Sequence, residues 1–291
     1  MNELTGTRHF CAATACREDF RSQPDNSHGW GVLRVAELEI CLLGPFEVCW
    51  DFVPVAPSAW RNPLAAKLLK IVLVMRPDRV SSEDACRWLG GGTKPQDLPA
   101  LVDHVCRVLK PAAALYLEDG QLRFEPGAKC WIDLDAMQEH YRAGLRAAAR
   151  GEMFPAILAF QEADALYQGA LLEELNEPWV ATARRGAREL YTEILDRLAE
   201  GHAVLSRYQD AVGFCHKALS HDPLREKTYQ RMMVYYYYLG DLPGAAEAYH
   251  ACREAIMGAG RRVSAETEAL WGTLSRCELP GHEAAAGRQD G

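Results

Sequence analysis

Cysteine and histidine are the residue types in this sequence that could bind a metal ion or act as nucleophiles. The chain contains ten cysteines and nine histidines, and no two cysteines have Cys-x-x-Cys spacing. The densest group is His9-x-Cys11-x4-Cys16, with His28 further on, and this spacing fits no standard zinc site. We therefore expect free thiols that serve as small core residues, and no bound metal.

A catalytic site would need a nucleophile, a base and a stabilising group at compatible positions. The sequence has no Ser/His/Asp spacing of this kind, and its histidines are scattered. The run Gly90-Gly91-Gly92-Thr93-Lys94 resembles a phosphate-binding loop, but it follows a helical pattern and lacks the Gly-Lys-Ser/Thr order. We interpret it as a connector. We therefore expect no enzymatic activity and no cofactor.

The segment from Pro95 to Pro111 could instead contact nucleic acid. Its apolar residues recur at helical spacing, which predicts an amphipathic helix with one buried face. The opposite face is polar and carries charges of both signs, on Asp97, Asp103, His104, Arg107 and Lys110. A helix of this kind could read a DNA sequence, although the positive charges that favour phosphate are diluted here by carboxylates.

Short strands and helices lead up to this segment. We expect strands at Leu38–Leu43 and Phe46–Trp50, and a third at Phe52–Val55 that Pro54 holds to a sheet edge. Asn62 is expected to cap a helix over Pro63–Met75, and Ser81 or Ser82 a second helix that ends at Leu89.

A hairpin is expected after the third helix. The runs Leu115–Leu117 and Gln121–Phe124 flank Glu118-Asp119-Gly120, which is a hairpin signal. Strands, three helices and a terminal hairpin are the order of a winged helix-turn-helix. In such a domain the third helix enters the major groove and the hairpin touches the DNA backbone.

Past Trp131 the pattern is helical throughout. Helices are expected over residues 133–150, 152–167, 178–205, 208–219, 223–239, 242–257 and 264–277. Tyr208–Ala218 aligns with Leu242–Cys252 at an offset of 34 residues, with small residues at matching positions. This period is typical of tetratricopeptide repeats, whose stacked helix pairs form a concave surface that suits a partner.

Aromatic and basic residues mark two stretches of the helical part. The run Tyr235, Tyr236, Tyr237 and Tyr238 covers all sides of its helix, so we expect some of these rings in the core and others in a partner groove. A cluster of arginines, Arg184, Arg185 and Arg188, is expected to form a solvated face of the long helix.

Composition and charge are those of an ordinary soluble protein, while the predicted elements indicate a mainly α chain in which an α+β winged helix precedes an all-α tetratricopeptide-like domain. The chain has 291 residues, 48% hydrophobic and 25% charged, and a net charge of −8 argues against wholesale attraction to nucleic acid. We expect a flexible leader over residues 1–35, a winged helix over 36–130, a helical domain over 131–279 and a flexible tail over 280–291. With neither a signal peptide pattern nor a membrane-spanning run, we expect a cytoplasmic protein.

Motifs in both halves resemble the family of bacterial transcriptional activator domain regulators. These are Leu42-Leu43-Gly44-Pro45-Phe46-Glu47-Val48, Arg79-Val80-Ser81-Ser82-Glu83, Trp131-Ile132-Asp133-Leu134-Asp135-Ala136 and His221-Asp222-Pro223-Leu224-Arg225-Glu226. The resemblance implies an OmpR-like winged helix followed by a tetratricopeptide-like helical domain. It also implies a bacterial regulator that binds promoter DNA and contacts RNA polymerase or another regulatory protein, or forms a homodimer.

The sequence of the Pro95–Pro111 helix, which would read the DNA, departs from that family. Members usually show paired asparagines and a Ser-Arg-Leu-Arg-Arg-like core, where this chain has Gln96, Asp97 and Asp103-His104-Val105-Cys106-Arg107. Two hypotheses follow. In the first, the chain binds DNA through Lys94, His104, Arg107, Lys110, Arg123 and Lys129. In the second, a scaffold or sensor of the same architecture has lost autonomous DNA binding and holds a protein or small ligand in the groove at Tyr235 to Tyr238.

Overall fold

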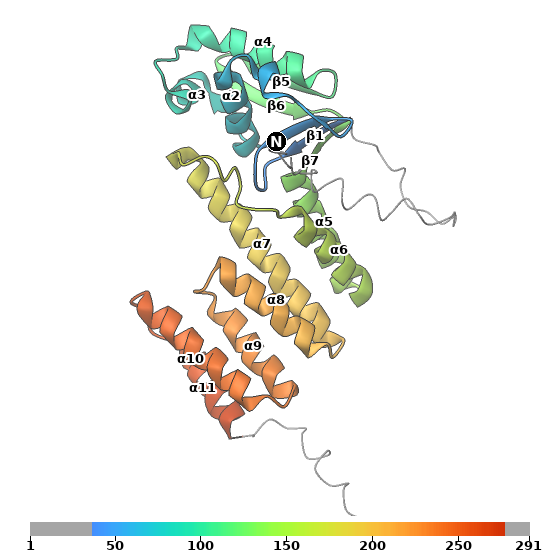
Figure 1. Ribbon diagram of the computed structural model, residues 1–291, viewed down its shortest axis with the longest axis vertical. Coiled ribbons are helices and arrows are strands. Elements are labelled where there is room, and N and C mark those ends of the chain that lie inside the picture. Colours follow the sequence, from blue (N-terminus) through green and yellow to red (C-terminus); the bar gives the residue numbers. More distant parts are fainter. Residues whose placement is uncertain (1–36, 277–291) are drawn as a thin grey trace, which may run out of the picture. The chain divides into compact units, whose positions relative to one another are not determined.

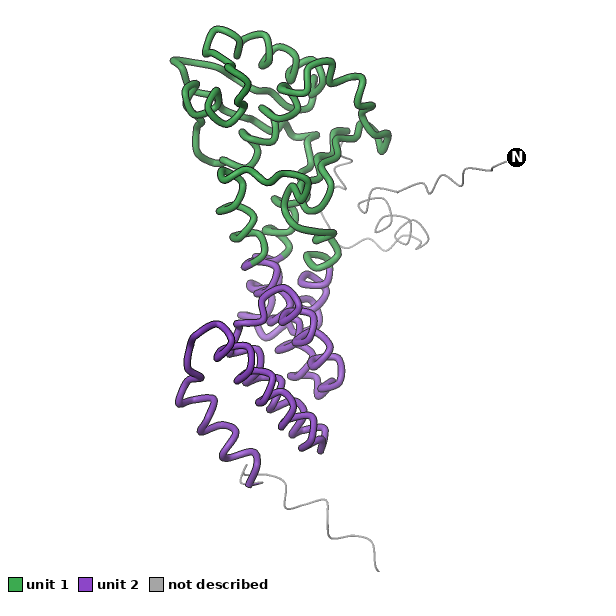
Figure 2. Tube along the Cα trace, turned by 60° about the vertical axis from the view of Figure 1, so that its left-hand side comes forward, with its two compact units in different colours: residues 1–140, 162–188 green, residues 141–161, 189–291 purple. Residues whose placement is uncertain are grey.

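The computed structural model of the chain describes residues 37–276, which form two compact units (Figures 1 and 2). Within the described residues, the first comprises 37–140 and 162–188, and the second 141–161 and 189–276. The group of His9, Cys11, Cys16 and His28 lies outside the described residues, as do the expected leader and the expected tail. Each unit is described by itself below.

The first sheet of unit 1 has the strand order β3-β2-β1-β7. Its strands are β1 (Leu38–Cys41), β2 (Glu47–Trp50), β3 (Val53–Pro54) and β7 (Cys130–Ile132). The expected edge strand is β3, and β7 was not foreseen. It pairs in parallel with β1, bringing Ile132 opposite Ile40. Asp133 follows directly, and its Oδ2 accepts hydrogen bonds from the backbone N–H groups of Leu42 and Leu43 at 2.7 and 2.8 Å. This carboxylate satisfies two buried donors where β1 ends.

The helices of unit 1 begin where the sequence places their caps. The side chain of Asn62 accepts from Leu64 N at 2.9 Å at the start of α2 (Pro63–Val74). Ser81 caps α3 (Ser82–Leu89) by accepting from Asp84 N at 3.0 Å. Two short elements were not anticipated, the 3-10 helix η2 (Pro57–Trp60) and the strand β4 (Val80–Ser81). Each is only two to four residues long, too short for a periodic pattern.

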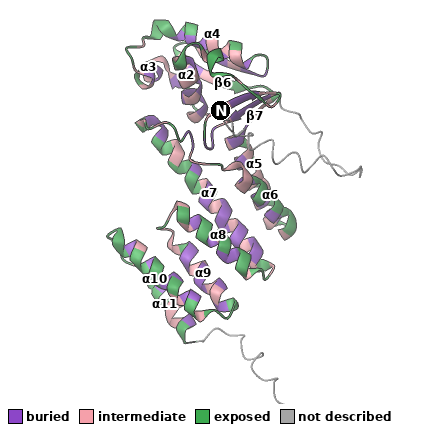
Figure 3. Cartoon of the chain, in the orientation of Figure 1, coloured by how far each residue is buried: buried purple, intermediate pink, exposed green. Residues whose placement is uncertain are grey.

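The segment from Pro95 to Pro111 forms a 3-10 turn, η3 (Pro95–Asp97), that continues into α4 (Leu98–Leu109). The apolar face of α4 is buried in contact with α2 and β5, through Leu98, Leu101, Val102, Val105 and Leu109. Buried and exposed residues alternate along this helix, as Figure 3 shows. The amphipathic helix predicted here is confirmed.

The predicted hairpin is also present, as β5 (Ala113–Glu118) and β6 (Gln121–Pro126), which pair in antiparallel register. Asp119 and Gly120 both have positive φ, of 50° and 72°, as the tight turn requires. The short strand β4 joins β6, so the second sheet has the order β4-β6-β5. Three helices followed by a hairpin thus stand in the order that the sequence predicts.

Unit 1 includes residues 170–175, called the return segment below, which pack on the end of β1. Leu172 N donates to Leu42 O at 2.8 Å, and Gly44 N donates to Ala170 O at 3.2 Å. The guanidinium of Arg184 donates to three backbone carbonyls of this segment, those of Leu171, Leu172 and Leu175, at 2.6 to 2.8 Å. The expectation that Arg184 lies on a solvated face is therefore wrong, because the segment has carbonyl groups that need a donor.

The helices after β7 are α5 (Asp133–Ala149), α6 (Met153–Leu166) and α7 (Pro178–Val204), and the division into units falls within each of them. Unit 2 continues with α8 (Tyr208–His221), α9 (Glu226–Tyr238), α10 (Leu242–Gly258) and α11 (Ala265–Ser275). These bounds agree with the predicted ranges to within a few residues. The largest difference is at α9, expected from residue 223, because Asp222 Oδ1 accepts from Leu224 N at 3.1 Å and holds a turn there.

Small residues allow the helices of unit 2 to pack closely. Ala211 and Ala218 in α8, and Ala245 and Cys252 in α10, are fully buried, and these are the aligned positions of the 34-residue repeat. Asp196 of α7 is only 2% exposed and accepts from Thr228 Oγ1 at 2.8 Å. It also pairs with Arg225 at 2.5 Å and Arg231 at 3.2 Å, so its buried charge is compensated.

No helix within residues 37–276 is both long enough and apolar enough to cross a membrane.

Candidate nucleic-acid interface

The solvent side of α4 is the part of unit 1 that could enter a DNA groove. Its exposed residues include Ala100, Asp103 and Arg107, and Lys110 follows at the end of the helix. Arg107 Nε donates to the carbonyl oxygen of Asp103 at 3.3 Å, within the same helix. Neither Arg107 nor Lys110 has an ion-pair partner among the described residues, so both charges are available to an external anion.

Lys94 lies at the start of the same element. Its backbone N–H donates to Asp97 Oδ2 at 2.9 Å, which caps η3. The Lys94 side chain is exposed and has no carboxylate partner within residues 37–276. Asp97 therefore has a structural role at the start of this segment, because its carboxylate caps η3.

The other predicted DNA-contact residues already have partners. His104 Nε2 lies 2.9 Å from the carbonyl oxygen of Ala59, so η2 is tied to α4. Arg123 forms an ion pair with Glu125 and lies over the ring of Tyr116, 5.0 Å from its centroid. Arg123 and Glu125 are two residues apart on one strand and therefore share a face.

Lys129 lies away from the hairpin turn. It forms an ion pair with Glu37, and its carbonyl oxygen accepts from Glu37 N and Leu38 N at 3.0 and 3.1 Å. These bonds place it at the start of the first sheet, beside β1. The structure thus brings His104, Arg107 and Lys110 together on one helix, with Lys94 at its entry, and leaves Arg123 and Lys129 on other elements.

The turn of the β5–β6 hairpin is acidic and anchored. Glu118 and Asp119 are exposed there, while Gly120 O accepts from Ser82 N at 2.8 Å and from Ser82 Oγ at 2.9 Å. Two hydrogen bonds therefore hold the turn against the start of α3. A hairpin of this kind offers phosphate no positive charge at its turn.

The four tyrosines predicted to line a partner groove divide by burial. Tyr235 and Tyr237 are 7% and 5% exposed, and burial raises the pKa of Tyr235 above its ordinary value. Tyr236 is half-buried, with its hydroxyl 3.1 Å from His216 Nε2. Tyr238 is 48% exposed and stacks on Tyr208 with ring centroids 4.9 Å apart. The exposed Tyr238, stacked on the half-buried Tyr208, could meet a partner, while the two buried rings hold the core.

The cysteines in the described part of the chain are free thiols. Burial raises the pKa of Cys130 and of Cys215 to about 12, which keeps both protonated near neutral pH. Cys106 Sγ donates to Leu115 O at 3.2 Å, so this thiol of α4 is held against β5. Within residues 37–276 no group of three or more His, Cys, Asp or Glu side chains is arranged to hold a metal ion.

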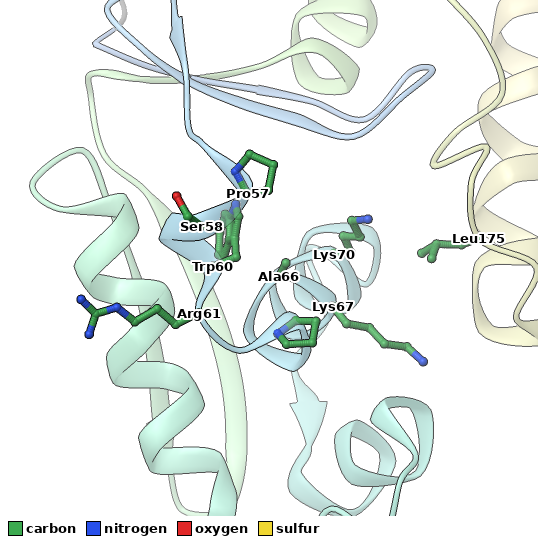
Figure 4. Close-up of a pocket in the computed structure, with 9 residues that line it drawn as sticks. Pro57, Ser58, Trp60, Arg61, Ala66, Lys67, Lys70 and Leu175 are labelled. Atoms are coloured by element: carbon green, nitrogen blue, oxygen red, sulfur yellow. The ribbon is translucent and has the colours of Figure 1, made fainter.

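A cavity in unit 1 was not predicted from the sequence. It has a volume of about 630 Å³ and lies against η2 and α2, with Trp60, Lys67 and Lys70 among its lining residues (Figure 4). The proline-bounded stretch from Pro57 to Pro63 was the available signal, since prolines restrict the backbone on both sides of Trp60.

Comparison with protein families finds one match. Residues 132–274 match the model of the bacterial transcriptional activator domain. The predicted resemblance is thus confirmed for the helical part of the chain, and the model does not reach the segment that holds α4. A search of curated protein sequences finds no match.

Comparison with solved structures finds three that match this chain to different extents. Mycobacterium tuberculosis EmbR, in complex with a low affinity phosphopeptide, superposes with a TM-score of 0.72 at 19% identity and covers 84% of this chain. This chain spans 66% of that protein's length. The complex of the TPR2B domain of yeast Sti1 with pHsp70 has a TM-score of 0.36 at 18% identity, over 49% of this chain and 98% of that one. The Aspergillus fumigatus Sgt2 TPR domain also has a TM-score of 0.36, at 21% identity, over 52% of this chain and 91% of that one.

Proposed function

We propose that this chain, which carries a bacterial transcriptional activator domain over residues 132–274, is a transcriptional regulator that binds promoter DNA through a winged helix within residues 36–130. The observation that carries the proposal is the order of α2, α3, α4 and the β5–β6 hairpin, with α4 buried on one face and exposed on the other. A helix so placed is free to enter a major groove. The EmbR-like fold supports the same architecture.

In this proposal α4 reads the duplex and its cations hold the phosphates. Arg107 and Lys110 extend from the helix, and Lys94 precedes it, so these three are the primary contacts. His104, Arg123 and Lys129 are secondary contacts, because each would have to exchange an existing partner for a phosphate. Asp103 lies on the same exposed face, where it can accept a hydrogen bond from a cytosine amino group.

The helical domain would then contact a protein. We assign this role to the face around Tyr208 and Tyr238 in unit 2, where the exposed ring of Tyr238 stacks on the half-buried ring of Tyr208. Aromatic rings are enriched at protein interfaces because they bury a large area at a small entropic cost. RNA polymerase, another regulatory protein or a second copy of the chain are the partners proposed for it.

A mobility-shift titration across salt concentrations tests DNA binding. Duplexes selected from a random-sequence pool replace the unknown promoter, and the wild-type protein is compared with Arg107→Ala/Lys110→Ala. We expect the double variant to bind more weakly and the slope of log K against log salt to fall by about two. Lys227→Ala, an exposed lysine of α9, is the matched control. Selection that yields no shifted duplex, at any salt concentration, contradicts the proposal.

A second function is favoured by the partners of the basic residues. Arg123, Lys129 and His104 are all engaged internally, and Asp103 is exposed on α4. These features favour a scaffold or sensor that keeps the architecture without binding DNA. In that case Arg107→Ala/Lys110→Ala would leave regulation in cells unchanged, while Tyr238→Ala would abolish it.

A further inference from the structure

We propose that the cavity between η2 and α2 binds a small amphipathic organic anion. Its acid group would lie on the ammonium groups of Lys67 and Lys70, and its apolar part on the ring of Trp60. This inference goes beyond the proposed function and does not depend on it, because every residue involved lies in unit 1 and outside α4.

The size and lining of the cavity suit a small molecule. Its volume of about 630 Å³ is within the range of sites for small ligands, and apolar groups supply most of its wall. Pro57, Trp60 and Pro63 come from η2 and the start of α2, and Ala66 from the next turn. Leu175 completes the wall from the return segment, and Figure 4 shows it reaching toward α2 from the side opposite Trp60.

Two partly buried ammonium groups give the cavity its charge preference. The side chains of Lys67 and Lys70 are 24% and 14% exposed. Arg61 also lines the cavity, but in Figure 4 its guanidinium points away from both lysines. No carboxylate is among the lining residues, but Glu177 and Glu174 pair with the two ammonium groups from outside the lining. An anion in the cavity would share the two cations, one helical turn apart, with these glutamates.

The lysines keep donors for such a ligand. Lys67 Nζ pairs with Glu177 Oε1 at 2.8 Å and reaches Leu89 O at 3.4 Å. Lys70 Nζ pairs with Glu174 Oε1 at 2.5 Å and lies 4.5 Å from the centroid of the Phe46 ring. An ammonium group has three N–H donors, so each lysine retains at least one beyond these bonds. The glutamates also hold both ammonium groups in place before a ligand arrives.

The contact of η2 with α4 would link ligand binding in the cavity to the position of α4. Trp60 follows Ala59, whose carbonyl oxygen lies 2.9 Å from His104 Nε2 on α4. A ligand that packs on Trp60 would therefore stabilise the 3-10 turn that contacts α4. Occupancy of the cavity and the position of the proposed reading helix would then be linked.

Two fluorescent probes with one aromatic frame test the proposal. Anilinonaphthalene sulfonate is an amphipathic anion, and N-phenyl-1-naphthylamine is the uncharged counterpart. Each is titrated into the full chain. We expect Lys67→Gln/Lys70→Gln to weaken sulfonate binding about fivefold and to leave the uncharged probe unchanged. Trp60→Ala should weaken both probes, because both stack on the indole ring.

Controls separate this site from others. Ala66→Leu fills the cavity without altering a charge, so it should weaken both probes even if the lysine variant unfolds. Lys227→Gln, in unit 2, should change neither. Circular dichroism establishes that each variant is folded. Probe affinities that stay the same in Trp60→Ala and Ala66→Leu would overturn the proposal. So would equal weakening of both probes by a folded Lys67→Gln/Lys70→Gln protein.

Discussion

Arg225 and Arg231 in unit 2 and Arg107 in unit 1 have different kinds of partner. In unit 2, Arg225 and Arg231 converge on the buried carboxylate of Asp196. On α4 of unit 1, Arg107 reaches only a carbonyl oxygen of its own helix. A guanidinium surrounded by carboxylates adds to the rigidity of a core, whereas one left at the surface can be used for an external anion. The comparison indicates that charge placement, more than charge count, separates cations used inside the fold from cations left available at the surface.

Removal of the buried carboxylate should have the largest effect. Asp196→Ala leaves Arg225 and Arg231 partly buried without their shared partner, and breaking a buried pair in this way costs about 3 kcal/mol or more. We expect the free energy of unfolding, measured by urea denaturation, to fall by that amount. The exposed Glu254→Ala in α10 should change it by less than about 0.5 kcal/mol. A loss equally small for Asp196→Ala would show that the network adds little stability.

Arg184 tests whether unit 1 also uses an arginine structurally. Arg184→Ala removes three hydrogen bonds to the carbonyls of Leu171, Leu172 and Leu175. Hydrogen bonds from a charged donor to buried acceptors are costly to lose, and we expect a destabilisation of about 2 kcal/mol. Arg185→Ala, the exposed neighbour, is the matched control and should be nearly neutral. Thermal unfolding of the two variants gives the comparison directly, and equal melting temperatures would refute the structural role of Arg184.

Asp103→Asn tests whether the exposed face of α4 meets the phosphates of DNA. Asp103→Asn removes a negative charge from the exposed face of α4 while keeping the size of the side chain. If α4 faces phosphate, affinity for selected duplexes should rise about threefold, with the largest gain at low salt. The equivalent change Glu254→Gln in unit 2 should not alter binding. Weaker binding by Asp103→Asn would instead indicate that the carboxylate accepts a hydrogen bond from a base.

The smallest expected effect is at Glu226, where a substitution should change how the free energy of unfolding depends on pH. Desolvation acts to raise its pKa, but hydrogen bonds from Thr267 and Ser264 outweigh this and lower it. A lowered pKa in the folded state means that the charged form contributes stability above the unfolded-state pKa of about 4.3, and that this is lost as pH falls below it. Glu226→Gln should therefore make the free energy of unfolding less dependent on pH below about 5. If the free energy of unfolding depends on pH below about 5 in the same way in both proteins, these bonds do not favour the charged form.

Local patterns in the sequence predicted most of the elements. The period of Leu98, Leu101, Val105 and Leu109 was enough to place α4, and Asp119-Gly120 was enough to place the hairpin turn. The 34-residue offset predicted which small residues of α8 and α10 would be buried. These features depend on neighbours a few residues apart, which is why they can be read from a single chain.

Long-range pairing could not be predicted in the same way. Nothing near Ile132 indicates that β7 pairs in parallel with β1, about ninety residues earlier, or that Asp133 accepts from Leu42 and Leu43. Arg184 looked like a solvated cation because its carbonyl partners lie in a segment without regular structure. The partners of Lys129 and His104, which decide how available these side chains are, also come from distant parts of the chain. The internal pairing of Arg123 with Glu125 was the exception, because alternation along a strand places both on one face.

The bonds of Asp133 limit where the protein can be cut. A fragment ending at Cys130 would keep α4 and the hairpin, but it would lose most of β7 and the carboxylate that satisfies Leu42 N and Leu43 N. Two buried donors would be left unmatched and β1 would gain an open edge, the kind of edge on which chains aggregate. Any attempt to produce the part with α4 and the hairpin alone should therefore extend at least through Asp133.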